Sequence, residues 1–246
     1  MKHLLLALPL GLVLAPAYGQ HMEYSARGTV GFAKFAGNGV ASTTTVNDAN
    51  NVPNAESSRA VNPYGNTYGT GGGLSVRVQR VEKFNVITAF DLGYDLMQTR
   101  LGVTAIRYNS IVPPDYGFNR AGSGVVRLFS HAVTAFGGVG YRLGGEGHAL
   151  ALDALVGPEL AYLVAAHENG DGTNSSGTAW HTDLSRTPNT HFDFRLRGDL
   201  SIWRKRVGVV ASYSYGFSNY QPATSGVSSP DASIRLARVG LGYRLK

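Results

Sequence analysis

Acidic and basic side chains alternate with apolar ones in several segments of this chain, and their spacing limits the chemistry they can do. The clearest case is FDFRLRGDLSIW, residues 192–203, where Asp193, Arg195, Arg197 and Asp199 occupy every second position. Residues two apart in an extended strand lie on one face, so these four charges share a face opposite the phenylalanines and leucines. Carboxylates and guanidinium groups that share one enclosed face favour ion pairing.

The same alternation marks eight segments, and each is predicted to be a β-strand. They are residues 23–35, 71–81, 84–99, 124–143, 148–166, 191–203, 207–219 and 232–245. The connections between them alternate in length. Tight turns are predicted at RVEK, GGEG and RKR, whereas long polar loops follow the first, third, fifth and seventh strands. Short turns on one rim and long loops on the other are typical of outer-membrane barrels.

The composition indicates which face of each strand points inward. Charged residues make up only 15% of the chain, against about 25% in an ordinary soluble domain. The polar faces combine Gly and Ser with Arg and Asp, which suits a narrow interior, and the apolar faces carry Tyr, Phe and Trp near the strand ends. The apolar faces are therefore predicted to contact lipid, with the aromatic residues as interfacial girdles. A soluble lipocalin-like barrel, with its apolar face inside, is the alternative.

A sheet that spans lipid must pair all its backbone groups, so the first and last strands are predicted to close the barrel. The fold class predicted is all-β: a closed antiparallel eight-stranded transmembrane β-barrel with short periplasmic turns and long extracellular loops. Eight strands leave an interior that side chains can fill. The predicted lumen charge network is Arg27, Arg77, Asp91, Asp95, Asp153, Glu159, Asp193, Arg195, Arg197, Asp199 and Arg238.

The N-terminus has the pattern of an export signal. A lysine, a short apolar run and the small-x-small site Ala17-Tyr18-Gly19 predict a signal peptide over residues 1–19, followed by the barrel domain over residues 20–246.

The chain has no cysteine, so no disulfide is expected. We expect the protein in the outer membrane of a Gram-negative bacterium. Its net charge of +6 permits anionic partners, but export argues against nucleic acid.

Several further stretches carry the pattern of a known family. They are GGGLSVRVQ followed by NVITAFDLGYDL, then AFGGVGYRLG before a tight turn, and the closing RVGLGYRLK. With the signal and the eight segments, the chain resembles the small eight-stranded outer-membrane β-barrel family, the OmpA/OmpX-like group and its PorT-like relatives. The resemblance implies a closed barrel with both termini in the periplasm. Members often end in an aromatic residue, whereas this chain ends in Tyr243-Arg244-Leu245-Lys246.

Three stretches suggest other chemistry at first sight, and none is assigned a site. The loop HENGDGTN offers alternating oxygen ligands but lacks the spacing and the closing glutamate of a calcium loop, so it is interpreted as a solvated loop. Ser130 and His131 are adjacent in a strand and therefore face opposite ways, which argues against a hydrolase pair. The glycine-rich GTGGGLSVRV enters a strand rather than a helix, so it is not expected to bind phosphate. No cofactor, metal or catalytic residue is predicted.

Basic residues are predicted to gather at the periplasmic rim, where they would meet lipid head groups or a periplasmic partner. They are Arg80, Lys83, Arg142, Arg204, Lys205, Arg206, Arg244 and Lys246. The function predicted is a non-enzymatic outer-membrane protein with a structural, adhesion or partner-binding role, through its loops or this rim. The alternatives are a narrow pore, a component of a secretion or motility machine, a lipid-modifying barrel enzyme and a soluble lipocalin-like binder.

Overall fold

The computed structural model describes residues 21–48, 58–108, 118–144, 149–221 and 230–245, and these residues form strands and their connections. The predicted signal peptide, the GGEG turn and Lys246 lie wholly or partly outside these ranges. Within the described residues, no helix is long and apolar enough to cross a membrane.

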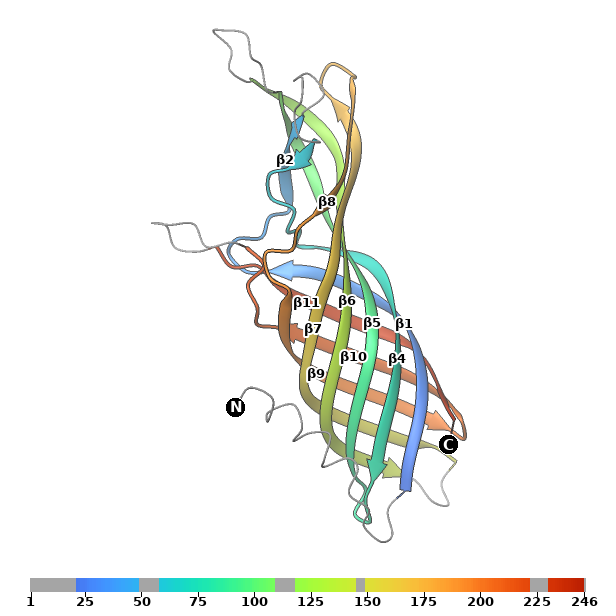
Figure 1. Ribbon diagram of the computed structural model, residues 1–246. Coiled ribbons are helices and arrows are strands. Elements are labelled where there is room, and N and C mark those ends of the chain that lie inside the picture. Colours follow the sequence, from blue (N-terminus) through green and yellow to red (C-terminus); the bar gives the residue numbers. More distant parts are fainter. Residues whose placement is uncertain (1–20, 49–57, 109–117, 145–148, 222–229, 246) are drawn as a thin grey trace, which may run out of the picture.

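Eight antiparallel strands form a closed ring, as predicted (Figure 1). In order around the ring they are β1 (His21–Ala36), β4 (Thr67–Val81), β5 (Val86–Tyr108), β6 (Phe118–Gly144), β7 (Ala151–Asn174), β9 (Phe192–Arg204), β10 (Val207–Gly216) and β11 (Ser233–Arg244). The first and last strands close it, with Ser25 opposite Arg244 and Ala36 opposite Ser233. This closure leaves the barrel without a free sheet edge, which a sheet in hydrocarbon requires.

The outer face of the ring is a continuous apolar belt. Large apolar side chains from all eight strands project outward and remain about half exposed. They include Val30, Phe32, Leu74, Val76, Leu92, Tyr94, Val133, Val139, Val156, Leu160, Phe194, Leu196, Leu200, Ile202, Val209, Tyr213, Val239 and Leu241. An exposed apolar surface of this extent is incompatible with water and suits the hydrocarbon of a bilayer. The chain is therefore a transmembrane β-barrel, and the lipocalin-like alternative, with its apolar face inside, is excluded.

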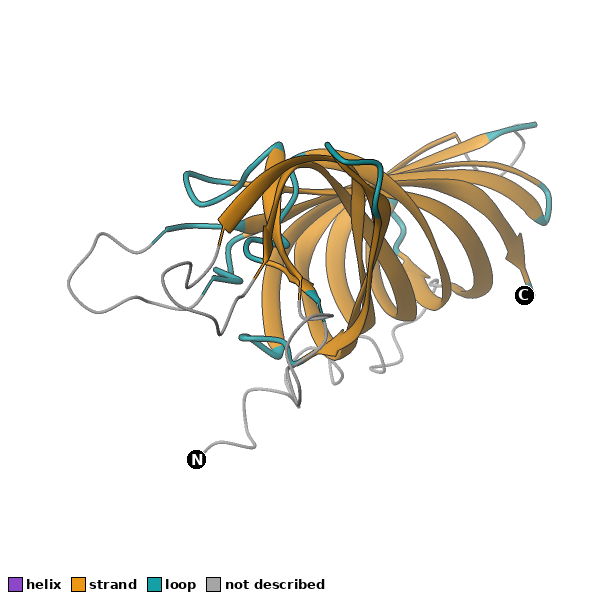
Figure 2. Ribbon diagram, turned by 90° about the horizontal axis from the view of Figure 1, so that it is seen from above, coloured by secondary structure: helices purple, strands orange, loops and turns teal. Residues whose placement is uncertain are grey.

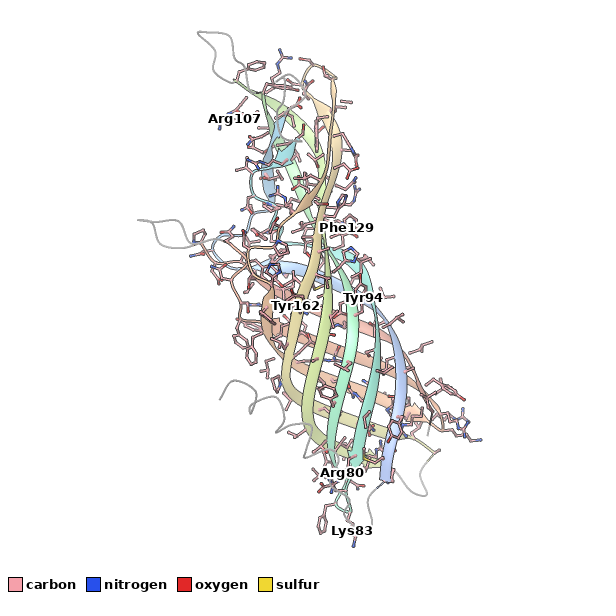
Figure 3. The ribbon with its side chains drawn as sticks, viewed as in Figure 1. Arg80, Lys83, Tyr94, Arg107, Phe129 and Tyr162 are labelled. Atoms are coloured by element: carbon pink, nitrogen blue, oxygen red, sulfur yellow. The ribbon has the colours of Figure 1, made fainter. Side chains whose placement is uncertain are left out.

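The two rims differ as expected. On the periplasmic rim, β4 and β5 are joined by residues 82–85, and β9 and β10 by Lys205 and Arg206 alone. Asn85 and Lys205 have positive φ angles of 61° and 55°, which such tight turns require. Lys83 lies at the lower tip of the β4–β5 turn (Figure 3).

On the opposite rim the prediction of plain loops is wrong. Strands β5, β6 and β7 continue well beyond the barrel, and the first and third loops contain three more strands: β2 (Thr43–Asp48), β3 (Arg59–Ala60) and β8 (Ala179–Arg186). β2 pairs in parallel with β5, β3 pairs with β2, and β8 pairs with β7. We call this the extracellular extension. It stands above one side of the barrel, and from above its strands curve into a smaller ring (Figures 1 and 2).

The polarity of the long strands reverses where they leave the barrel. On β5, Asp91 and Asp95 are buried and Leu92 and Tyr94 are exposed, but further along Leu101, Val103 and Ile106 are buried while Arg100 and Arg107 are exposed. The inward side is thus polar inside the barrel and apolar inside the extension. Register shifts on β5 between Gly102 and Ala105, and on β7 at Val164, lie in this upper part. The predicted strand boundaries at 99, 124 and 166 are wrong for this reason, because they assume an apolar outward side along the whole strand.

Candidate functional site

The structure places all eleven residues of the predicted lumen set inside the barrel. Each is at most 7% exposed, and Asp153, Glu159, Asp193 and Arg195 are fully buried. Each is engaged in an ion pair, in one of two groups, which we name the central cluster and the periplasmic cluster.

The central cluster joins five arginines to five carboxylates from several strands around the ring. Its members are Arg27, Arg77, Arg195, Arg197, Arg238, Asp91, Asp95, Glu159, Asp193 and Asp199. Because the numbers are equal, the cluster is neutral when all ten groups are ionised. A buried charge is tolerated only when it is paired in this way.

Arg197 is a hub of this cluster. One of its Nη atoms lies 2.6 Å from Asp199, and the other lies 3.3 Å from Glu159 and 3.4 Å from Asp91. Arg77 pairs with Asp91 through two nitrogens and donates to Asp199 at 2.9 Å, so the same acids are shared by neighbouring arginines. Such shared acids make the pairs a network rather than a row of independent bridges.

The cluster extends toward the extracellular end through two more arginines. Arg238 contacts Asp95 at 2.6 Å and Glu159 at 3.0 Å and also donates to the Ser214 hydroxyl at 2.8 Å. Arg195 contacts Glu159 at 3.2 Å and Asp193 at 2.5 Å. Glu159 on β7 therefore accepts from three arginines, which lie on β9 and β11.

The periplasmic cluster is largely missed by the sequence analysis. Asp153 is predicted to face the lumen, but its partners Arg142 and Arg244 are assigned to the lipid-facing rim, and that assignment is wrong. Arg142 is 4% exposed and lies 2.6 Å from Asp153 and 2.7 Å from Glu23. Arg244 lies 3.2 Å from both acids. The signal is present in the sequence: residues 23 and 27, and residues 238 and 244, share the same side of their strands. Lys83, Arg204, Lys205 and Arg206 are exposed at the rim, as expected.

Aromatic rings occupy part of the remaining lumen, and the position of Trp203 corrects the prediction that Trp shares the outward-facing girdle with Tyr and Phe. Trp203 is 1% exposed, with the guanidinium carbons of Arg27 and Arg244 at 5.8 Å and 4.3 Å from its ring, so it separates the two clusters. Gly208 and Gly242 make room for it, since a Cβ at either position would lie within 2.7 Å of the ring. The exposed girdle consists of tyrosines and phenylalanines instead.

The lumen is filled between its two ends. A void of about 20 Å³ borders Arg27, Asp95, Arg197 and Arg238, which is the space of about one water molecule. Wider clefts of about 780 Å³ and 720 Å³ open at the periplasmic end, beside Trp203, and at the extracellular end, beside Tyr220. The described side chains therefore form a plug between two open mouths.

Two tyrosines cap the plug on the extracellular side. The Tyr220 hydroxyl donates to Asp193 at 2.8 Å, and the Tyr64 hydroxyl donates to the Tyr220 carbonyl at 2.7 Å. Both rings pack edge-on against Phe35 at 5.0 Å between centroids. Burial raises the pKa of both phenols above the usual range, so both remain neutral at physiological pH.

The extension is built the opposite way, around an apolar core. The core consists of Val46, Ala60, Val103, Ile106, Tyr108, Val126 and Trp180. The Trp180 indole nitrogen donates to the Ser123 carbonyl at 3.2 Å, which satisfies its one polar atom. Trp180 thus joins β8 to β6 across the interior.

A side-chain pair closes the seam between the outermost strands of the extension. Glu168 is fully buried, accepts from the Ala60 backbone nitrogen at 2.8 Å and pairs with Arg186 at 2.5 Å. Arg186 in turn donates to the Ala60 carbonyl at 2.6 Å. The pair therefore links β3 to β7 and β8 through side chains. The interpretation of HENGDGTN as a solvated loop is wrong, because this segment belongs to β7.

His131 and His167 both lie on outer surfaces of the protein. Ser130 is buried and His131 faces outward, where its Nδ1 lies 2.5 Å from the Tyr94 hydroxyl. His167 pairs with Asp183 at 2.8 Å on the exposed face of β7 and β8. Among the described residues, no group of three or more His, Cys, Asp or Glu side chains is placed to hold a metal ion.

The fold and the filled lumen define the class of protein: a small, closed, membrane-spanning β-barrel. No family model and no curated protein matches the chain. Among solved structures it is similar to Ail, the attachment invasion locus protein of Yersinia pestis, in complex with the heparin analogue sucrose octasulfate, with 16% identity, a TM-score of 0.33 and coverage of 91% of this chain and 99% of that one.

It is also similar to Neisserial surface protein A, at 10% identity and a TM-score of 0.35, over 91% of this chain and 96% of that one. A major outer membrane protein from Thermus thermophilus shares 11% identity and a TM-score of 0.37, over 92% of this chain and 100% of that one.

Proposed function

We propose that this chain is a non-enzymatic outer-membrane protein whose barrel anchors the extracellular extension, and that the extension meets a partner outside the cell. The proposal rests on the different construction of the barrel and the extension. The barrel interior is occupied by ion-pair clusters of described side chains, with a water-sized void among them. The extension has its own core and exposes mainly polar side chains, as a surface made for an aqueous partner does.

The proposal includes its location and processing. Residues 1–19 would be removed as a signal peptide near Gly19, and residues 20–246 would form the barrel domain, as in the OmpA/OmpX-like and PorT-like proteins that the sequence resembles. Outer-membrane lipids surround the belt. The partner would be an extracellular protein at the extension or, as a second choice, a periplasmic protein at the basic rim.

The first experiment compares the gel mobility of the outer-membrane fraction with and without boiling. A closed barrel that resists detergent runs faster before boiling, and this is the expected result. The same samples are sequenced at the N-terminus, with residue 20 expected as the first residue. Recovery in the soluble periplasm without a mobility shift would overturn the location.

The orientation is tested by inserting an epitope after Gly177, in the β7–β8 turn, where a side chain would meet open space. The matched control carries the epitope after Lys205, in a periplasmic turn. Antibody should label intact cells for the first insertion and only permeabilised cells for the second. The reverse pattern would overturn the proposal.

The role of the extension is tested with a shortened chain. Arg100 and Arg127 lie opposite each other on β5 and β6, so residues 101–126 are replaced by an Asn-Gly turn that suits a hairpin. The barrel should still show the gel shift, while the adherence of expressing cells to protein-coated surfaces should fall to the level of cells without the protein. Unchanged adherence would contradict an extracellular partner at this site.

A narrow pore is the second candidate, because clefts open at both ends of the lumen. Planar-bilayer recordings separate the two functions. A barrel that only anchors the extension gives no steady ion current. A pore gives stepwise currents, and the Arg197→Ala variant would change the size of these steps.

A further inference from the structure

Two cations face each other on the lipid-facing side of the barrel, at its extracellular end. Lys34 on β1 is the direct register partner of Arg235 on β11, and both side chains point outward between buried neighbours. Directly opposed residues on antiparallel strands have Cβ atoms about 4.5–5.5 Å apart, and like charges there are destabilising. The arrangement therefore calls for a counter-charge.

The described part of the protein supplies no such counter-charge. Among these residues, no carboxylate pairs with either cation, whereas all the lumen arginines have acidic partners. The Arg235 Nη1 donates to the Gly216 carbonyl at 3.0 Å, the Ile234 carbonyl at 2.8 Å and the Ser233 hydroxyl at 3.1 Å. These uncharged acceptors orient the guanidinium group and leave its charge uncompensated.

Two tyrosines hold the pair in place. The Lys34 Nζ lies 4.7 Å from the centre of the Tyr68 ring, and the Arg235 guanidinium carbon lies 3.4 Å from that of Tyr215. The rings come from β4 and β10, so Tyr68, Lys34, Arg235 and Tyr215 form a row across four adjacent strands. Both tyrosines are nearly half exposed, at 46% and 43%. Cation–π contacts of this kind preorganise the charged groups at the surface.

On β1, the row lies at the extracellular end of the apolar belt. The next outward residues toward the periplasm are Phe32 and Val30 on β1, both more than 40% exposed, and beyond the row β1 ends at Ala36. The cations are therefore at the level where hydrocarbon gives way to lipid head groups. An anion that neutralises these two cations must therefore reach them from the head-group layer.

We propose that Lys34 and Arg235, flanked by Tyr68 and Tyr215, bind a phosphate group on the head group of an outer-leaflet lipid. A guanidinium group and an ammonium group side by side match the charge of a phosphate and the geometry of its oxygens. The tyrosine hydroxyls can add hydrogen bonds at the edges of the row. This inference is separate from the proposed function of the extension, since it concerns the barrel wall alone.

The test uses the full mature chain in detergent micelles and native mass spectrometry to measure lipid binding. The probes are diphosphorylated lipid A, the same glycolipid with its phosphates removed, and inorganic phosphate. The expected result is binding of the phosphorylated lipid, weakened about 30-fold in the Lys34→Gln/Arg235→Gln double variant, because each interfacial cation contributes a factor of about five. The dephosphorylated lipid should bind as weakly to the wild type as the phosphorylated lipid binds to this variant.

The control removes the same charge elsewhere. Arg107 and Arg120 are exposed on the extension, far above the belt, as Figure 3 shows for Arg107. The Arg107→Gln/Arg120→Gln variant should bind the phosphorylated lipid like the wild type. Equal loss in both variants, or equal binding of the two glycolipids, would overturn the proposal. Displacement of the lipid by inorganic phosphate at equal concentration would overturn the assignment to a lipid. Boiling-dependent gel mobility verifies that each variant is folded.

Discussion

The barrel and its extracellular extension share three strands, yet they are built with opposite polarity. In the barrel, β5 turns Asp91 and Asp95 inward and Leu92 and Tyr94 outward; in the extension the same strand turns Leu101 inward and Arg100 outward. The inward side of the strand thus changes from polar to apolar, and beyond the register shift between Gly102 and Ala105 it passes to the even-numbered residues, such as Ile106.

The difference follows from the solvent around each part. In water, the extension gains free energy by burying apolar surface, at about 25 cal/mol per Å². In lipid this gain vanishes, because the surroundings are as apolar as any core. The barrel interior is therefore held by ion pairs and hydrogen bonds, and the extension by packing.

The largest expected effect comes from breaking the central cluster. Arg197→Ala leaves Glu159, Asp91 and Asp199 each without one cationic partner in a buried site. Removing one partner of a buried pair costs about 3–5 kcal/mol. The urea midpoint of unfolding, measured in detergent by gel shift, should fall accordingly. Arg107→Ala, an exposed arginine on the extension, is the control and should leave the midpoint unchanged. An unchanged midpoint for Arg197→Ala would mean that the ion pairs do not stabilise the barrel.

The next effect is expected to be confined to the extension. Trp180→Ala empties the centre of its apolar core, which costs about 3 kcal/mol in a packed interior. Limited proteolysis of intact cells should then cleave the extension many times faster, while the gel shift of the barrel remains. Loss of the gel shift in this variant would show that the barrel and the extension fold as one unit, and would contradict their separate stabilisation.

A smaller effect is expected at the seam of the extension. Glu168→Gln removes the charge that binds Arg186 and weakens the acceptor for the Ala60 nitrogen. The expected cost is about 1–3 kcal/mol, seen as faster hydrogen exchange in β3 and β8. Asp183→Asn, which breaks an exposed pair with His167, is the matched control and should change exchange by less than about 1 kcal/mol. Equal effects of the two variants would contradict a structural role for the seam.

The smallest effect concerns pH at the extracellular mouth. Burial raises the pKa of Tyr220 above its unfolded value of about 10. A group whose folded pKa is raised stabilises the fold below the unfolded pKa and loses that contribution as pH increases through the folded pKa. Wild-type barrel stability should therefore decline above about pH 10, and the Tyr220→Phe variant should decline less. The variant should also lose about 1 kcal/mol at neutral pH, because Asp193 loses a donor. If the stability of the wild type and of the Tyr220→Phe variant declined in parallel with pH, the burial of a neutral Tyr220 phenol would be contradicted.

Particular residues show how far sequence reasoning reaches. Strict alternation is enough to find the eight barrel strands, because in each of them the outward side is apolar and the inward side is polar. The same rule fails at Arg100, where the outward side becomes polar and the strand continues. It also misplaces Arg142 and Arg244, since they lie near strand ends and basic residues are common at membrane rims.

The barrel can be predicted from the amino-acid sequence alone. The period-two pattern, the alternation of short and long connections and the low charge content suffice, because a sheet in lipid must close and must face lipid with its apolar side. The sequence also places acids and bases on the inner face. Which charges pair depends on the folded arrangement of the strands, since Arg197 and Glu159, or Arg142 and Glu23, meet in the lumen from strands distant in sequence. The tertiary structure alone reveals the extension, whose core forms from two loops and the ends of β5 and β6, which no local pattern links.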